Sequence, residues 1–225
     1  MSFKYYEFKY FVPALLLDRT IELLNAFYGG TDPFPEGWLS SVYFDSQDRK
    51  SINECKNGSL YKRKFRMRKY GQNDDSNCQL QIKEKELNAV WKHKLSVDTA
   101  NDEKWPYHLI PMSTNIFTLS SQYHNLEPIV KTTYFRRRYR VFDYRITLDA
   151  KIHFKSCYGF RNQRFKAMFL PFGVLEIKTK QDNPKLPFFK LINLKQVSFS
   201  KLYLAVQCLE NTEGFLNKYI AEAAD

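Results

Sequence analysis

The chain has 225 residues, 44% hydrophobic and 16% aromatic, which is enough to bury a substantial core; we expect one domain over residues 1–225. Its 35 Lys and Arg side chains against 24 Asp and Glu leave a formal charge of +11, which favours polyanionic partners: nucleic acid, phosphate chains or anionic membrane surfaces. The four cysteines form no C-x-x-C pair, which excludes a zinc ribbon and a redox motif.

The first half of the chain is predicted to contain a strand, a helix and then more strands. Residues 3–12 are rich in aromatic side chains, which is typical of a strand, and Pro13 suits the first turn of a helix. This helix should run to about Tyr28, because its apolar residues share one face and Gly29 and Gly30 supply a stop. The next predicted strands are residues 38–44, 59–70, 78–85 and 90–97, divided by Gly58, a turn cluster at 71–77 and a short link at 87–89.

The second half returns to strands after a section of weaker pattern. Residues 101–125 lack a clear period and allow a helix, and strands are predicted again at 128–140, 144–153 and 173–180. The tail from Pro184 is predicted to be helical, with interruptions at Pro187 and at residues 197–201. No stretch approaches the roughly 18 apolar residues that span a bilayer, and residues 3–10 do not form a signal core. We therefore expect a soluble, cytoplasmic protein.

Basic residues recur at every second position within the predicted strands. Lys64, Arg66 and Arg68 alternate with the apolar residues Phe65 and Met67, which places the charges on one face of a sheet. The same spacing occurs at Gln81, Lys83 and Lys85, at Lys92 and Lys94, at Arg136, Arg138 and Arg140, and at Glu176, Lys178 and Lys180. This repetition predicts a cationic surface or lumen.

The order of elements favours an α+β, β-dominated fold, because strands joined by short links do not build a doubly wound parallel sheet. A closed antiparallel β-barrel with flanking helices fits this order: its apolar residues would pack outward and its charges would line the lumen. Two like charges about 4 Å apart repel by roughly 4 kcal/mol at an effective dielectric constant near 20. A crowded cationic lumen therefore calls for bound anions or compensating carboxylates.

Seven short motifs resemble the vacuolar transporter chaperone (VTC) domain, in order along nearly the whole chain. They are EFKY at 7–10, VYFD at 42–45, FRMRKYG at 65–71, YFR at 134–136, RITLD at 145–149, VLEIK at 174–178 and FSK at 199–201. Each motif is weakly specific alone, and their order carries the resemblance. The VTC domain belongs to the triphosphate tunnel metalloenzymes, a CYTH-like superfamily whose eight-stranded antiparallel tunnel agrees with the predicted barrel.

The resemblance implies a polyphosphate polymerase, which transfers the γ-phosphate of ATP to a growing polyphosphate chain. Phosphoryl transfer depends chiefly on positioning and on neutralising charge, so basic side chains in a tunnel suit it. The implied catalytic positions are Lys9, Arg66, Arg68, Lys83, Arg136, Arg145 and Lys201. The implied substrate-binding positions are Lys92, Lys94, Tyr134, Lys178 and Ser200. Glu176 matches a metal-binding glutamate, and an oxygen ligand suits Mn²⁺ or Mg²⁺.

Three positions depart from related sequences. Gln81 stands where relatives commonly carry glutamate, and Ser198 replaces a lysine found in some relatives. The triphosphatase branch carries an E-x-E-x-K signature on its first strand, whereas residues 5–9 read YYEFK and keep only the second half. This loss favours the polymerase branch over hydrolysis, and Glu7 is predicted to pair with a cation of the lumen.

Two alternatives stay open at this level: a metal-dependent triphosphatase acting on polyphosphate or nucleoside triphosphates, and a polyanion-binding module without catalysis. Nucleic acid is a weaker candidate, since it requires exposed aromatics beside the cations, whereas Phe65 alternates out of phase with Arg66. The chain has no P-loop, no G-x-G-x-x-G and no G-x-S-x-G motif, so side chains would have to hold the phosphates. ATP and polyphosphate are the expected partners, with a membrane protein as a possible further one.

Overall fold

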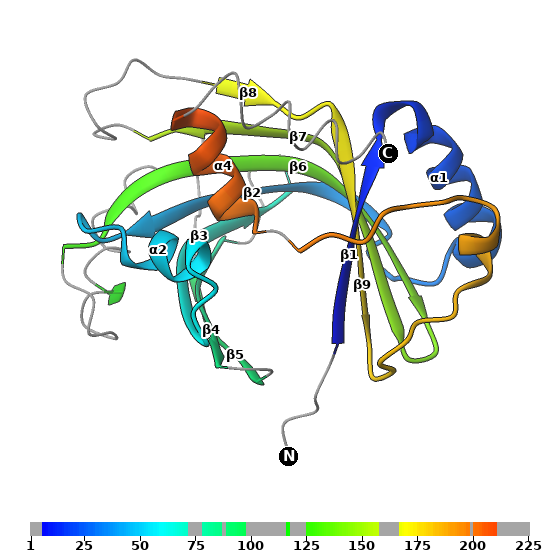
Figure 1. The fold of residues 1–225 in the computed structure, drawn as a ribbon, viewed down its shortest axis with the longest axis horizontal. Helices are drawn as coiled ribbons and strands as arrows, with labels where there is room; N and C mark the ends of the chain where they lie inside the picture. Colours follow the sequence, from blue (N-terminus) through cyan, green and yellow to red (C-terminus); the bar gives the residue numbers. More distant parts are fainter. Residues whose placement is uncertain are drawn as a thin grey trace.

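The computed structural model describes residues 6–71, 78–86, 89–97, 116–117, 125–157, 167–198 and 200–210. Most of these residues belong to antiparallel strands or to short helices packed on them (Figure 1). The elements in chain order are β1 (Tyr6–Pro13), α1 (Ala14–Tyr28), β2 (Glu36–Asp45), α2 (Lys50–Lys56), β3 (Tyr61–Tyr70), β4 (Cys78–Glu86), β5 (Ala89–Val97), β6 (Glu127–Val141), β7 (Tyr144–Ser156), β8 (Ala167–Phe169), β9 (Phe172–Thr179), the 3₁₀ helix η1 (Pro187–Lys190) and α4 (Lys201–Glu210).

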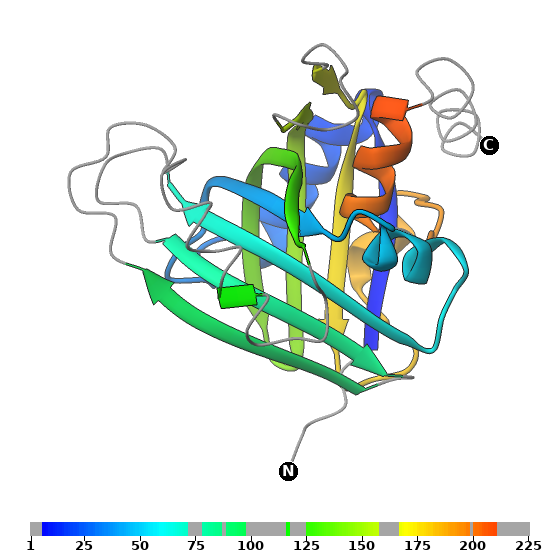
Figure 2. The same cartoon turned by 90° about the vertical axis from the view of Figure 1, so that its left-hand side faces the viewer.

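The nine described strands form a single antiparallel sheet. Its order is β1-β9-β7-β6-β2-β3-β4-β5, and the short β8 pairs with β7. Figure 2 shows β3, β4 and β5 crossing the direction of β1, β7 and β9, so the sheet is strongly curved. The β-dominated α+β class is therefore confirmed. In the described part of the chain β1 pairs with β9 and β5 pairs with β4, and the two edge strands form no ladder with each other, so closure of the barrel stays a prediction.

The predicted alternation determines which face of each strand is apolar. Ile146, Leu148, Leu175 and Ile177 are all at most 1% exposed and pack with α1 and η1. On the other half of the sheet, the apolar side chains of β3 and β4 form a second cluster together with Phe117. The apolar residues of the strands therefore pack on the face opposite the basic residues, as the period-two pattern predicted.

Helix α4 packs against β6, β7 and β8 and is held at both ends. Its apolar residues Leu202, Val206 and Leu209 are buried in a cluster that also contains Tyr134 and Phe154. The side chain of Ser200, just before the helix, accepts a hydrogen bond from the amide of Tyr203 over 3.3 Å. At the other end, Glu210 forms an ion pair with Arg49. The first residues of α4 are thereby placed on the concave side of the sheet.

The sequence pattern missed α2 and β8. Helix α2 follows Asp45, whose buried carboxylate accepts hydrogen bonds from the amides of Ser46, Ser51 and Ile52 over 2.9–3.0 Å. These bonds fix a seven-residue helix that has too little apolar pattern to be predicted.

The predicted helical tail is wrong in its first part. Pro187 begins the 3₁₀ helix instead of interrupting a longer helix, and regular helix resumes at Lys201. Between them the chain is extended, and the amide of Val197 donates to the Lys9 carbonyl over 2.8 Å. Residues 3–5, and nearly all of 101–124, lie outside the described residues. None of the described helices has the length and apolar character required to cross a membrane.

Candidate functional site

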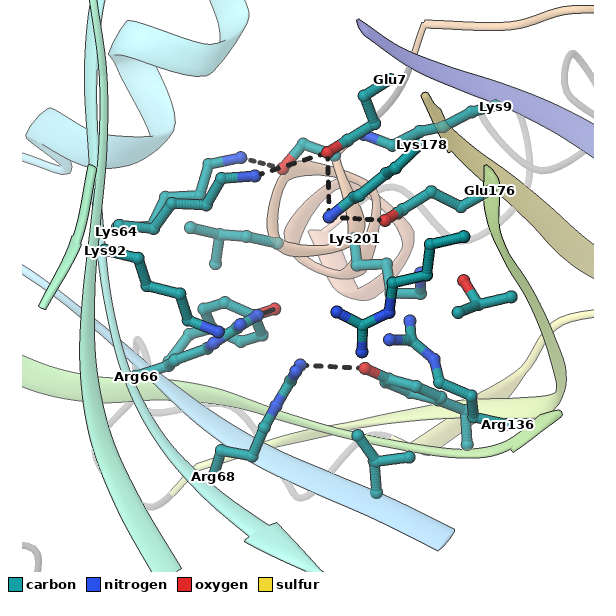
Figure 3. A pocket seen from close by; sticks show the side chains of 18 of the residues that line it. Glu7, Lys9, Lys64, Arg66, Arg68, Lys92, Arg136, Glu176, Lys178 and Lys201 are labelled. Carbon is teal, nitrogen blue, oxygen red and sulfur yellow. Dashed lines mark hydrogen bonds and ion pairs between the residues drawn. The ribbon is translucent and has the colours of Figure 1, made fainter. Parts of the chain in front are cut away.

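The concave side of the sheet contains a strongly basic cavity (Figure 3). Its volume is about 230 Å³, many times the roughly 10–15 Å³ that one water molecule requires. Twelve Lys and Arg side chains and two Glu side chains line it, so the lining carries a large excess of positive charge. The charged lining residues are Glu7, Lys9, Lys64, Arg66, Arg68, Lys83, Lys92, Lys94, Arg136, Arg138, Arg145, Glu176, Lys178 and Lys201.

All thirteen site residues named from the sequence line this one cavity. They come from six strands, β1, β3, β4, β5, β6 and β9, from the start of β7, and from Ser200 and Lys201 where α4 begins. Strand pairing explains the convergence on one side: Lys9 lies opposite Glu176 on β9, and Arg145 lies opposite Lys178. The structure therefore brings these thirteen residues together, and their catalytic, substrate-binding and metal-binding roles stay predictions.

One side of the cavity holds its cations close to carboxylates, and we call it the acid-bearing wall: Glu7, Lys9, Arg136, Glu176, Lys178 and Lys201, with Asp149 behind them. Asp149 is fully buried and accepts two bonds from Arg136, over 2.6 and 2.8 Å. Its second oxygen also lies 2.6 Å from the ammonium of Lys201. Burial opposes ionisation of Asp149, but Arg136 and Lys201 outweigh it and hold the pKa below the usual range.

Glu7 and Glu176 contribute the carboxylates that line the cavity itself. Glu7 lies 2.6 Å from Lys9, 3.3 Å from Lys178 and 3.8 Å from Lys83, and Glu176 lies 3.0 Å from Lys178. Burial and the neighbouring carboxylate raise the pKa of Glu7, but Lys83, Lys9 and Lys178 bring it to about 2. The pKa of Glu176 is likewise well below its usual range, because nearby cations, Lys178 foremost, outweigh the cost of burial. Both groups are ionised at neutral pH.

The opposite side, which we call the acid-free wall, consists of Lys64, Arg66, Arg68, Lys92 and Lys94 from β3 and β5. Within the described ranges, no carboxylate lies within ion-pair distance of these five cations.

The partners found for this wall are neutral oxygens. Lys64 donates to Ser200 over 2.7 Å, and Arg66 donates to Gln81 over 2.9 Å and to Tyr43 over 3.3 Å. Arg68 donates to Ser41 over 3.0 Å and to Tyr134 over 2.9 Å.

The crowding of cations lowers the affinity of the acid-free wall for protons. The side chain of Lys92 is exposed, yet partial desolvation and the charges of Arg66, Arg68 and Lys94 lower its pKa to about 6. Burial opposes ionisation of Tyr43, yet Arg66 and Arg68 outweigh it and bring that pKa to about 8. The wall is therefore poised to gain stability from a bound anion.

Tyr134 connects the two walls. Its hydroxyl accepts the hydrogen bond from Arg68, while the Arg136 guanidinium carbon and the Lys201 ammonium lie 5.3 and 5.1 Å from the centre of its ring. Because its hydroxyl accepts from Arg68, the hydroxyl proton is free to point toward a ligand.

The lining partly suits a divalent cation. Mg²⁺ and Mn²⁺ take oxygen ligands and are commonly held by one or two carboxylates plus phosphate oxygens and waters. Glu176 fits this role as a single ligand, and its Oε1 atom is 3.0 Å from the Lys178 ammonium, which a bound ion would have to displace or share. The described residues contain no group of three or more Asp, Glu, His or Cys side chains placed to hold a metal without a phosphate.

Several contributing residues were not identified from the sequence. Asp149 was part of a quoted motif but received no role, although it shares the cavity face of β7 with Arg145 and Thr147. Lys64 and Arg138 belonged to the alternating pattern but received no role, and both line the cavity. In each case the two-residue alternation was the signal, since a strand that carries one inward residue carries the next but one inward as well.

The two substituted positions differ in their surroundings. Gln81 is fully buried beside Arg66, and its amide nitrogen donates to Tyr70 over 3.3 Å and to Gln79 over 2.8 Å. A neutral amide therefore lies beside Arg66, which is one reason why this wall is acid-free. Ser198 is exposed in the extended segment before α4.

A family profile described as the VTC domain matches residues 4–210. The chain belongs to the VTC domain family. Among curated proteins, none matches this sequence.

Solved structures with a similar fold include a putative adenylate cyclase from Bacillus halodurans. It is 14% identical, with 87% of this chain and 92% of that chain covered and a TM-score of 0.52. A putative adenylate cyclase from Vibrio parahaemolyticus is 13% identical over 81% of this chain and 79% of that one, with a TM-score of 0.46. At such identities the Bacillus structure supports the fold alone.

Proposed function

We propose that this VTC domain is a polyphosphate polymerase that transfers the γ-phosphate of ATP to a growing phosphate chain within the cavity. The observation that carries the proposal is the acid-free wall: five cations converge on one cavity with no carboxylate partner in the described part of the chain. Uncompensated charge of this kind is costly, and a polyanionic ligand removes the cost.

The acid-free wall would bind the phosphates. Arg66 and Arg68 stand two residues apart on β3, and each planar guanidinium can hold two phosphate oxygens at once. Lys92 on β5, which lies two strands from β3 in the same sheet, supplies a compact charge to the same space. Successive phosphates of a chain would therefore be neutralised along the wall without any base-specific or sugar-specific contact.

The reaction would join the terminal oxygen of the chain to the γ-phosphorus of ATP while the bond to the β-phosphate oxygen breaks, so that ADP leaves. Such a transfer needs alignment and charge stabilisation more than covalent catalysis. Arg136 and Lys201 suit this task because Asp149 holds both in fixed positions. Tyr134 and Ser200 would add neutral hydrogen bonds to phosphate oxygens.

Mn²⁺ or Mg²⁺ would be held by Glu176 and by the phosphates themselves. When bound, the ion would neutralise negative charge on neighbouring phosphate oxygens. Lys178 lies beside Glu176, and Arg145 on the adjacent strand β7 lies opposite Lys178. Lys178 and Arg145 can therefore contact the same phosphates. Lys9 lies directly across from Glu176 on β1 and completes the group.

The proposed tunnel requires the eight-stranded barrel to close between β1 and β5. Side chains from both edge strands already line one cavity, and Glu7 on β1 lies 3.8 Å from Lys83 on β4. ATP and polyphosphate are the proposed partners. A cytoplasmic location and a membrane-protein partner stay predictions of the sequence.

A metal-dependent triphosphatase is the second candidate, because Glu7 and Lys9 retain half of the triphosphatase signature and both line the cavity. It would use the same phosphate contacts with water as the acceptor. A binding module without catalysis is the third candidate. Nucleic acid is disfavoured, since Phe65 and Met67 are fully buried on the face away from the cations.

One assay separates the three candidates. Purified protein is incubated with ATP and Mn²⁺ or Mg²⁺, and both long-chain polyphosphate and free phosphate are followed. Chain growth supports the polymerase, free phosphate alone supports the triphosphatase, and neither product supports the binding module. The Glu176→Gln variant should keep its fold and lose the metal dependence of turnover; unchanged metal dependence removes Glu176 from that role.

A further inference from the structure

Glu7 differs from Asp149, the fully buried carboxylate of the acid-bearing wall, because Glu7 lines the cavity. Asp149 is fully buried and contacts Arg136 and Lys201 from outside the cavity lining, so it orients these cations without occupying the ligand space. Glu7 lines the cavity, and its side chain is 27% exposed. Its carboxylate therefore lies in space that a ligand could enter.

The contacts of Glu7 are those that a phosphate oxygen would make. Its two oxygens lie 2.6 Å from the ammonium of Lys9, 3.3 Å from that of Lys178 and 3.8 Å from that of Lys83 (Figure 3). Three ammonium groups around one anionic group form a typical phosphate site. In this chain the anion is supplied by the protein.

The pair with Lys83 also crosses the cavity. Glu7 belongs to β1 and Lys83 to β4, strands that are not neighbours in the sheet. Lys83 lies two residues from Gln81, which is hydrogen-bonded to Arg66 of the acid-free wall. A phosphate chain that extends from that wall to Lys9 and Lys178 would reach ammonium groups that Glu7 now contacts.

We propose that Glu7 competes with the substrate for a second phosphate subsite, formed by Lys9, Lys83 and Lys178. The Glu7 carboxylate occupies this subsite when no ligand is bound. A phosphate chain long enough to reach across the cavity displaces it. A single phosphate finds the acid-free wall uncovered and has no need to displace Glu7. Glu7 thus determines how long an anion must be before it engages both walls. This inference rests on the proposed function only in taking a phosphate chain as the ligand.

The test is titration calorimetry with orthophosphate and with long-chain polyphosphate, in chelator and at fixed physiological ionic strength. In Glu7→Gln the dissociation constant of the long chain should fall by about tenfold, the scale of one hydrogen bond to a charged group. The dissociation constant of orthophosphate should change by less than about threefold, because a single phosphate held by Arg66 and Arg68 does not have to displace Glu7 from its ammonium partners, and salt screens the interaction that remains.

The control is Glu84→Gln, which makes the same change of net charge. Glu84 is on β4 but pairs with Arg63 and Tyr61 and does not line the cavity, so affinity for both ligands should be unchanged. Glu7→Asp provides a second variant with the charge retained. Its shorter side chain retracts from Lys83, so it should strengthen chain binding by a smaller factor than Glu7→Gln.

Two outcomes overturn the inference. The first is chain affinity that is equal to or weaker than that of the unmodified protein in both Glu7 variants, which would make Glu7 a positioning residue for Lys9. The second is an equal increase in affinity for orthophosphate and for the long chain, which would reflect the change in net charge alone. Failure of the unmodified protein to bind any phosphate contradicts the proposed function instead, so the two failures are distinguishable.

Discussion

The two walls of the cavity carry similar numbers of cations but compensate them in different ways. On the acid-bearing wall, Asp149 is shared by Arg136 and Lys201, and two glutamates surround Lys178. On the acid-free wall, Arg66 and Lys92 have no such partner among the described residues.

This difference separates two requirements of a phosphate-transferring site. A cation that is paired from behind is held in a fixed orientation and adds to the stability of the fold. A cation without a carboxylate partner costs stability and keeps its full charge for a ligand. The first arrangement suits residues that must be aligned with the reacting group, and the second suits residues that must attract a long polyanion.

The largest effect should come from removing the acid behind the acid-bearing wall. Asp149→Asn leaves Arg136 and Lys201, 13% and 11% exposed, without their charge partner. Breaking a buried pair by removing one member costs about 3–5 kcal/mol, so the free energy of unfolding in urea should fall by that amount. A loss below about 1 kcal/mol would show that the two walls do not differ in this way.

The next effect should come from making the acid-free wall resemble the other one. Gln81→Glu places a carboxylate where the amide oxygen now accepts from Arg66 over 2.9 Å. The new ion pair would compete with phosphate, and affinity for tripolyphosphate should fall by about tenfold in calorimetry. Gln47→Glu, outside the cavity lining, is the matched control and should leave affinity unchanged. Equal affinity in the Gln81 variant would contradict the role assigned to this wall.

Lysines on opposite walls should respond oppositely to pH. The folded pKa of Lys92, about 6, is below its ordinary value of 10.5, so between these limits the unfolded chain binds the extra proton and stability rises with pH. Lys92→Met should therefore raise the melting temperature most near pH 6, and the gain should shrink toward pH 10.

Lys178→Met is the counterpart on the acid-bearing wall. Burial lowers the pKa of Lys178, but Glu176 and Glu7 outweigh it and raise that pKa above 10.5. Its pairing stabilises the fold at all pH values below 10.5 and is lost as pH rises through the folded pKa. Lys178→Met should melt at a lower temperature than the unmodified protein at neutral pH. If both Lys92→Met and Lys178→Met changed the melting temperature in the same direction, the proposed contrast between the two walls would be wrong.

The smallest effect is expected for an ion pair on the outside of the sheet. Arg137 donates to Glu36 over 2.7 Å, and both side chains are substantially exposed. Glu36→Gln should change the free energy of unfolding by at most about 1 kcal/mol, because solvent screens the pair. Comparing urea unfolding of this variant with that of Asp149→Asn measures how much burial adds to the stabilisation by an ion pair. Equal losses in the free energy of unfolding would show that the buried and exposed pairs do not differ.

The sequence was sufficient to predict the cavity face of each strand. Period-two alternation placed Lys64, Arg66 and Arg68 on the side opposite Phe65 and Met67, because successive residues of a strand point to opposite faces. The same rule could have identified Asp149, which stands four residues after Arg145 on β7.

Other features depend on contacts between distant parts of the chain. Helix α2 is fixed by the buried Asp45 carboxylate, and a sequence pattern does not reveal which aspartate will be buried. The partner of Glu7 on β4 depends on how far the sheet curves, which is set by twist and by bulges such as the register shift of β2 against β6. The division into two walls arises from these long-range contacts.

The most direct test of the account is a crystal structure of the protein with tripolyphosphate. We predict phosphates inside the cavity in contact with Arg66, Arg68 and Lys92, with Asp149 still paired to Arg136 and Lys201. Tripolyphosphate bound only outside the cavity, or bound within it without touching the acid-free wall, would contradict this prediction.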